Sequence, residues 1–106
     1  MHDRCLIVTI VRKGWGDAVL EASMAAGAHG GTIVLGRGIG RNEQLRVFGI
    51  QIEPEKEIVL TLVPTEIKAA VLDAIVAAAE LDGPGKGLAF VVPVQDLVGV
   101  AHLVEE

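Results

Sequence analysis

Residues 36–41 read Gly-Arg-Gly-Ile-Gly-Arg, with a glycine at every second position and two arginines between or after them. Glycines let backbone amides approach an anion closely, and arginine side chains add fixed positive charge. Arg37, Arg41 and Arg46 place three of the five arginines in one short region of an acidic protein. The segment predicts an anion-binding loop, and a flexible turn with solvated charges is the alternative. A dinucleotide-binding loop is excluded, because its glycines must open a helix.

A second glycine-rich segment, residues 83–87, reads Gly-Pro-Gly-Lys-Gly and precedes an apolar run. It carries one cation, Lys86, so the same chemistry predicts a second place for an anion. The alternative is a tight turn from a helix to a strand, which glycine and proline also favour.

Lys56 is the third candidate, and it stands among three carboxylates, Glu53, Glu55 and Glu57. Such a run is typical of solvated charges without a ligand. Nothing around these carboxylates indicates the burial that general acid–base chemistry needs.

Catalytic and metal-binding patterns are not visible in the sequence. The histidines (His2, His29 and His102) lie in separate regions, and the single cysteine, Cys5, cannot form an internal disulfide. No serine stands in a nucleophile elbow, and the histidine and cysteine spacing does not match a zinc site. We therefore expect a protein that is not an enzyme and binds no metal. Cys5, beside an apolar run, is expected to be a small buried residue.

Composition narrows the class of protein further. The 106 residues suffice for one domain with a real core; 51% are hydrophobic and only 3% aromatic, which predicts a core of small aliphatic side chains. The net charge of −5 argues against a nucleic-acid surface. No apolar run reaches the roughly 18 residues of a membrane span. No signal-peptide core follows residues 1–4, so a cytoplasmic protein is expected.

The chain repeats one pattern, in which an apolar run leads through an alanine-rich stretch to a second apolar run. This pattern predicts strands at residues 6–11, 32–35, 58–63 and 88–92, one helix at residues 17–26, and another that starts after Pro64 and ends near residues 81–84. Asp17 is expected to cap the first helix or to add charge to its first turn, and Thr65 to cap the second. Residues 37–54 carry one short strand within 46–52, and function is expected in this polar segment.

The predicted strands are apolar at nearly every position, with Thr9 and Thr61 as the interruptions in the two longest. A sheet with one wetted face would alternate apolar and polar residues. Two helices can cover only one face of a four-stranded sheet, so the other face is expected to meet further copies of the chain. The sequence therefore predicts a homo-oligomer.

The two glycine-rich segments and Lys56, in their order along the chain, resemble the PII signalling proteins and the wider PII-like group, and the resemblance covers almost the whole chain. The resemblance is strongest in residues 30–42, in the strand that ends at Val63-Pro64, and in residues 85–94. It implies an α+β, ferredoxin-like β-α-β-β-α-β sandwich, with a four-stranded antiparallel sheet that carries two helices on one face. It also implies a single PII-like domain over residues 1–106, assembled as a homotrimer, with a T-loop at about 42–55 and a B-loop at about 82–87.

Members of this family bind adenine nucleotides between subunits and signal to a partner protein through the T-loop. By position, the resemblance implies a nucleotide- or anion-binding set made of Thr32, Gly38, Gly40, Arg41, Asn42, Lys56, Gly85, Lys86 and Gly87. Lys56 falls on a lysine that reaches phosphate or the 2-oxoglutarate carboxylate in typical members. No cofactor is obligatory, and AMP, ADP or ATP is the expected effector.

The sequence departs from the family where the family carries charge. Leu88 stands where the B-loop ends in a lysine, and Gly99 and Ala101 stand at two phosphate-clamping arginines. Asn42 replaces a glutamine that helps bind 2-oxoglutarate, and the absence of tyrosine excludes uridylylation. Three lost charge-assisted contacts, at about 1.5–3 kcal/mol each, weaken triphosphate binding strongly. A less charged nucleotide, or a small anion such as bicarbonate, is then favoured.

Two functions remain open from the sequence. In the first, a small effector enters between subunits and biases the T-loop, and an unidentified partner such as a transporter or metabolic enzyme responds. In the second, the trimer binds no nucleotide and its loop docks a transporter, an enzyme or a shell protein constitutively. The order of the glycine-rich cationic segments favours the first, and the missing cations favour the second.

Overall fold

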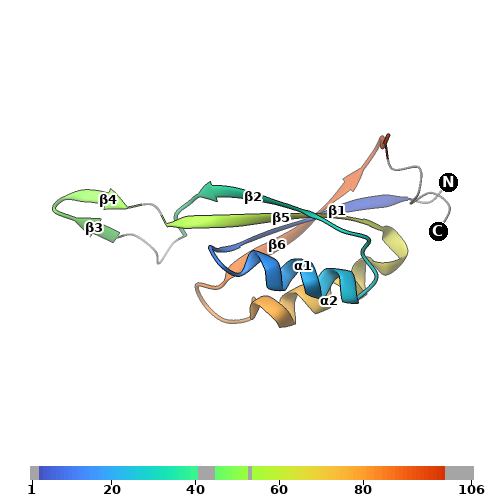
Figure 1. Ribbon diagram of the computed structural model, residues 1–106, viewed down its shortest axis with the longest axis horizontal. Coiled ribbons are helices and arrows are strands. Elements are labelled where there is room, and N and C mark those ends of the chain that lie inside the picture. Colours follow the sequence, from blue (N-terminus) through green and yellow to red (C-terminus); the bar gives the residue numbers. More distant parts are fainter. Residues whose placement is uncertain (1–2, 41–44, 53, 100–106) are drawn as a thin grey trace.

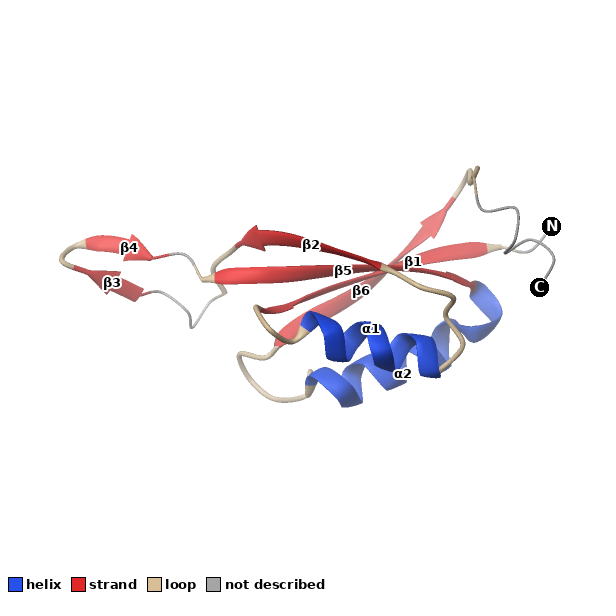
Figure 2. Ribbon diagram, in the orientation of Figure 1, coloured by secondary structure: helices blue, strands red, loops and turns tan. Residues whose placement is uncertain are grey.

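The computed structural model describes residues 3–40, 45–52 and 54–99 and shows one sheet covered by two helices (Figure 1). The sheet is antiparallel with strand order β2-β5-β1-β6, and both helices lie on one of its faces (Figure 2). The elements of this layer pair are β1 (Arg4–Arg12), α1 (Gly16–Ala25), β2 (Thr32–Arg37), β5 (Glu55–Pro64), α2 (Lys68–Ala79) and β6 (Gly87–Val94). The predicted ferredoxin-like fold is confirmed.

The core lies between the sheet and the helices and is built from small side chains. In β1, Cys5, Ile7, Thr9 and Val11 alternate with less buried residues and face the helices. The helices add buried residues at a spacing of four, namely Val19 and Ser23 from α1 and Val71, Ile75 and Ala79 from α2. Aromatic residues contribute little here, as the composition predicts. Cys5 is buried as expected, and burial raises the pKa of its thiol.

The opposite face of the sheet is also apolar, and no element in the described part of the chain covers it (Figure 2). Leu88, Phe90 and Val92 of β6 project to this face and are 40–51% exposed. The strand register places Val8 and Leu60 beside Phe90 in one cross-strand row. A homo-oligomer would bury this exposed apolar face, and the oligomer stays a prediction.

The helix ends differ from the sequence-based prediction in how they are capped. Asp17 lies in the first turn of α1 and adds negative charge there, but the N-cap position is Trp15 and its side chain makes no capping bond. The second helix opens with a 3₁₀ turn, η1 (Thr65–Ile67), and the prediction that Thr65 caps it is wrong. The Thr65 backbone instead donates a hydrogen bond to the Asp3 carbonyl (3.0 Å), which ties the turn to the chain before β1.

The predicted single strand at residues 46–52 is a hairpin. Its strands, β3 (Leu45–Val47) and β4 (Ile50–Ile52), pair only with each other, away from the main sheet (Figure 1). Phe48 and Gly49 join them, both at positive φ (53° and 81°), which is the backbone of a two-residue hairpin turn. Gly49 permits this reversal, and Phe48 is left completely exposed at its tip.

Candidate functional site

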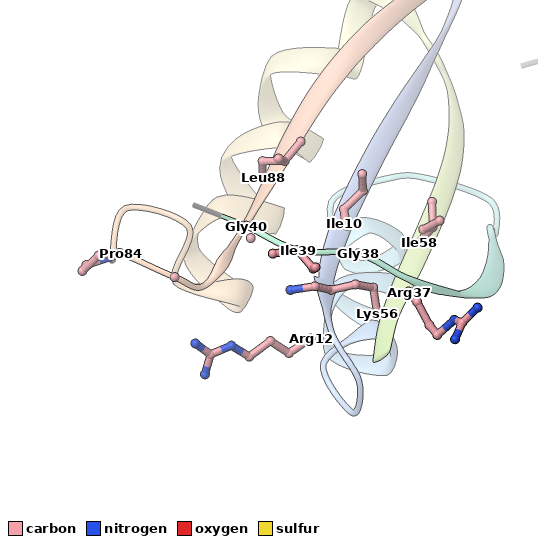
Figure 3. A pocket seen from close by; sticks show the side chains of 12 residues that line it. Ile10, Arg12, Arg37, Gly38, Ile39, Gly40, Lys56, Ile58, Pro84 and Leu88 are labelled. Atoms are coloured by element: carbon pink, nitrogen blue, oxygen red, sulfur yellow. The ribbon is translucent and has the colours of Figure 1, made fainter. Parts of the chain in front are cut away.

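A cavity of about 640 Å³ lies at the end of the sheet nearest the hairpin (Figure 3). Here β1 and β2 end and β5 and β6 begin, so four segments that are distant in sequence meet. The cavity is lined by Ile10, Arg12, Arg37, Gly38, Ile39, Gly40, Lys56, Ile58, Pro84, Gly85, Gly87 and Leu88.

The floor of the cavity is apolar. The strand register pairs Ile10 with Ile58 on one side and with Leu88 on the other, which makes one continuous row on the face without helices. Ile39, from the segment after β2, adds to this surface. An apolar floor of this kind fits the non-polar part of a small organic molecule.

Two cations lie beyond this row, at the end of the sheet. Arg12, the last residue of β1, is the direct cross-strand partner of Lys56. Their positive charges lie on adjacent strands, so both side chains can contact one bound anion. Figure 3 shows the Arg12 and Lys56 side chains extending to the same side of the sheet, whereas Arg37 turns away from them.

The two glutamates next to Lys56 in the sequence, Glu55 and Glu57, point to the opposite face of the strand, because successive residues of a strand alternate between faces. Glu55 pairs with Lys13 across 3.0 Å, and both side chains are largely exposed. Glu57 lies on the helix side, where its Oε1 accepts hydrogen bonds from the backbone N–H of Gly16 (2.7 Å) and of Gly14 (3.1 Å). The interpretation of a solvated charge run is therefore wrong for Glu57, which caps the start of α1 from the neighbouring strand.

The glycine loop, residues 82–87, borders the cavity through two glycines that no other residue could replace without strain. Gly85 and Gly87 have φ of 74° and 141°. A Cβ on Gly85 would lie 3.2 Å from Nη2 of Arg12, and a Cβ on Gly87 would collide with the Ile10 carbonyl. Gly85 thus brings the loop backbone beside the Arg12 guanidinium, and Gly87 brings it against the Ile10 carbonyl.

The backbone at the foot of the hairpin also belongs to the site. The Gly38 N–H donates a hydrogen bond to the Pro54 carbonyl across 3.1 Å. Gly38 lines the cavity, and Pro54 directly precedes β5 and lies two residues before Lys56. Both legs of the hairpin therefore reach the rim of the cavity.

The structure brings together part of the residue set expected from the sequence. Gly38, Gly40, Lys56, Gly85 and Gly87 line the cavity. Thr32 lies at the opposite end of β2, and the side chain of Lys86 is directed to the helices; neither lines the cavity. Arg41 and Asn42 lie outside the described residues.

Sequence reasoning missed Arg12 and the apolar row formed by Ile10, Ile58 and Leu88. The signal for Arg12 was its place at the end of an apolar run, in antiparallel register with the start of the run that carries Lys56. Leu88, the residue at the expected B-loop lysine, lines the cavity as part of its apolar floor. The other two residues that stand where the family carries a phosphate-clamping arginine are Gly99 and Ala101. Gly99 does not line the cavity, and Ala101 lies outside the described residues.

Within residues 3–40, 45–52 and 54–99, no group of three His, Cys, Asp or Glu side chains is placed to hold a metal ion. Cys5 sits at the far end of β1 from the cavity. No described helix has both the length and the apolar character required to cross a membrane.

Comparison with known proteins agrees with this architecture. A family model described as nitrogen regulatory protein P-II matches residues 4–102. The crystal structure of Arabidopsis thaliana PII bound to citrate superposes with a TM-score of 0.73 at 24% identity, over 96% of this chain and 87% of that one. A Bacillus cereus protein related to NIF3 gives 0.68 at 20% identity over 90% of this chain, which spans only 26% of that protein. At such identities these structures show the shared fold, and no curated protein matches the sequence.

Proposed function

The chain belongs to the nitrogen regulatory protein P-II family, and from that premise we propose that it is a signalling protein which binds a small anionic effector in the cavity. The observation that carries the proposal is the pair Arg12 and Lys56, directly opposite each other at the mouth of an apolar row. A regulator of this kind needs a binding site and a movable output, and it needs no catalytic group.

The effector class follows from the charges and the floor of the cavity. Two cations suit an organic anion of low charge, and the apolar floor with Leu88 suits a ligand that also carries a non-polar part. AMP and ADP meet this description better than ATP, and small carboxylates meet it as well. The Arabidopsis PII structure contains citrate, which makes citrate a suitable first probe.

The output is the hairpin and its flanks, about residues 42–55, acting as a T-loop. A ligand that contacts Lys56 and the Gly38 backbone touches both legs of the hairpin at its foot, where the Gly38–Pro54 hydrogen bond joins them. A ligand shifts a loop between two conformations when its contacts are more favourable in one of them than in the other. A partner protein, such as a transporter or a metabolic enzyme, would then respond to the loop.

The assembly is a homotrimer in this proposal, in which the open apolar face of each sheet meets neighbouring subunits. Burying Leu88, Phe90 and Val92 in this way also closes the cavity against a second chain. Sedimentation equilibrium at low micromolar concentration should give three times the 11.1 kDa chain mass. A monomer under those conditions would contradict the trimer.

A second function is favoured by one observation, the completely exposed Phe48 at the hairpin tip. An aromatic side chain there can anchor the loop in an apolar pocket of a partner without any effector, as a constitutive scaffold would. The two functions differ in one measurable respect. A scaffold binds its partner equally with and without small anions.

Isothermal titration calorimetry with citrate, AMP, ADP, ATP and bicarbonate tests the effector. Arg12→Ala and Lys56→Ala should each weaken the binding of the best ligand by about tenfold or more, because each removes a charge-assisted contact. Lys68→Ala is the matched control, since it removes one positive charge at the opposite end of the sheet. No heat with any ligand at millimolar concentration would refute effector binding.

A further inference from the structure

Lys86, the cation of the glycine loop, contacts the helix side of the loop. Its Nζ lies 3.4 Å from Oε1 of Glu80 and 5.6 Å from the ring centroid of Trp15. The Lys86 side chain is 35% exposed and that of Glu80 is 59% exposed, so the pair lies at the surface. An ion pair and a cation–π contact thus converge on one side chain.

Glu80 holds an unusual position for a glutamate. It follows α2 with a left-handed backbone (φ 56°), where glycine is the favoured residue. The Leu81 N–H closes the helix end by donating to the Val76 carbonyl across 3.0 Å. Glutamate adds what glycine could not, a carboxylate within reach of Lys86.

Trp15 connects this contact to the cavity. The Trp15 N–H donates to the Arg12 carbonyl across 3.1 Å, so both residues belong to one tight turn. Glu57 fixes that turn by accepting the Gly14 and Gly16 hydrogen bonds. The glycine loop therefore meets the same turn twice, through Lys86 at Trp15 and through Gly85 at Arg12.

We propose that Lys86 is a positioning residue that clamps the glycine loop, through Glu80 and Trp15, against the turn that carries Arg12. The clamp keeps the Gly85 backbone beside the Arg12 guanidinium, where both can contact the bound anion. Its effect on affinity rests on the proposed effector binding, whereas its effect on the loop does not. The competing assignment, in which Lys86 itself contacts the anion, makes the opposite prediction for Glu80.

The two assignments predict opposite changes in ligand affinity when Glu80 is substituted. Glu80→Gln removes the ion pair and keeps the shape of the side chain. A clamp predicts that citrate and ADP bind about threefold to tenfold more weakly to this variant. Direct contact predicts tighter binding, because the lysine is released from its carboxylate toward the anion.

Three further variants complete the set. Lys86→Met should weaken binding as Glu80→Gln does, and the double variant should be no weaker than Lys86→Met alone, because both changes break one contact. Lys86→Arg retains the charge and the stacking on Trp15, and it should bind almost as the parent chain does. Additive losses in the double variant, or tighter binding by Glu80→Gln, would overturn the clamp.

A measurement on the ligand-free protein keeps this test independent of the effector. Amide hydrogen exchange at Gly83, Gly85 and Gly87 should accelerate in Lys86→Met and Glu80→Gln and stay near the parent rate in Lys86→Arg. The emission of Trp15, the only tryptophan, should change in the first two variants alone. If the parent protein binds no probe, the proposed function fails while exchange still decides the clamp. Unchanged loop exchange in both variants refutes the clamp.

Discussion

Lys56 and Lys86 look interchangeable as anion ligands in the sequence, yet the structure gives them opposite surroundings. Lys56 stands in a run of carboxylates and lines the cavity, because strand alternation turns Glu55 and Glu57 away from it. Lys86 stands among glycines, the usual setting of a phosphate loop, and its amine is held by Glu80 and Trp15. A lysine's role is therefore set by the direction its backbone gives it, and its sequence neighbours are a poor guide.

The glycine loop itself gives the largest effect that bears on this comparison. Gly87→Ala places a Cβ against the Ile10 carbonyl at a φ of 141°, so we expect a loss of about 2–4 kcal/mol in the free energy of unfolding. Chemical denaturation measures this change. Gly30→Ala is the control, since its Cβ meets nothing within 4 Å; equal losses in the two variants would contradict the account.

Removing the charge of Lys56 should affect binding and leave the fold intact. Lys56→Met keeps the length of the side chain, and we expect a loss of about 1.5–3 kcal/mol in effector binding. Calorimetry on Lys56→Met and Lys86→Met side by side sharpens the comparison. A larger loss for Lys86→Met would mean that the roles of the two lysines are reversed.

Glu57 and Glu55 provide the same comparison for carboxylates. Glu57→Ala should cost about 1–2 kcal/mol of stability, because two N–H groups at the start of α1 lose their acceptor. Glu55→Ala removes an exposed pair with Lys13 and should cost about 0.5 kcal/mol or less. Thermal unfolding of both variants measures the difference, and similar costs would show that Glu57 is not a cap.

The smallest effect is expected at the hairpin tip. Phe48 is completely exposed, and asparagine adopts its positive φ more readily, so Phe48→Asn should change stability by less than about 0.5 kcal/mol. Binding to a partner protein should weaken in the same variant. Differential scanning calorimetry and a partner-binding titration measure the two effects, and a large loss of stability would mean that Phe48 packs against the body of the protein.

The sequence predicts the sheet and its helices well, because long apolar runs and alanine-rich stretches record burial directly. The two-residue turn at Phe48 and Gly49 escaped prediction, since a phenylalanine rarely adopts positive φ. The cap of α1 also escaped, because its acceptor lies on Glu57, 41 residues from Gly16. Local patterns cannot supply such a contact, which depends on the register between strands.

Local sequence patterns also predicted only part of the candidate site. The two glycine-rich segments identified two sides of the cavity, because glycine permits a close approach of the backbone, and the family resemblance added Lys56 on a third side. The place of Arg12 at the end of an apolar run was a weak local signal, and its pairing with Lys56 across β1 and β5 is what shows its role. The orientation of Lys86 depends on Trp15 and Glu80, which come from two other elements.

A titration of the ¹⁵N-labelled protein with citrate and ADP, followed by NMR, tests the central claim most directly. The account predicts that the largest shifts occur at the backbone amides of Gly38, Gly85 and Gly87 and at the Arg12 side chain, and that in Lys56→Met they appear only at about tenfold higher ligand concentration or above. Shifts that centre on a surface away from these groups, or that follow the same concentration dependence in Lys56→Met, would contradict it.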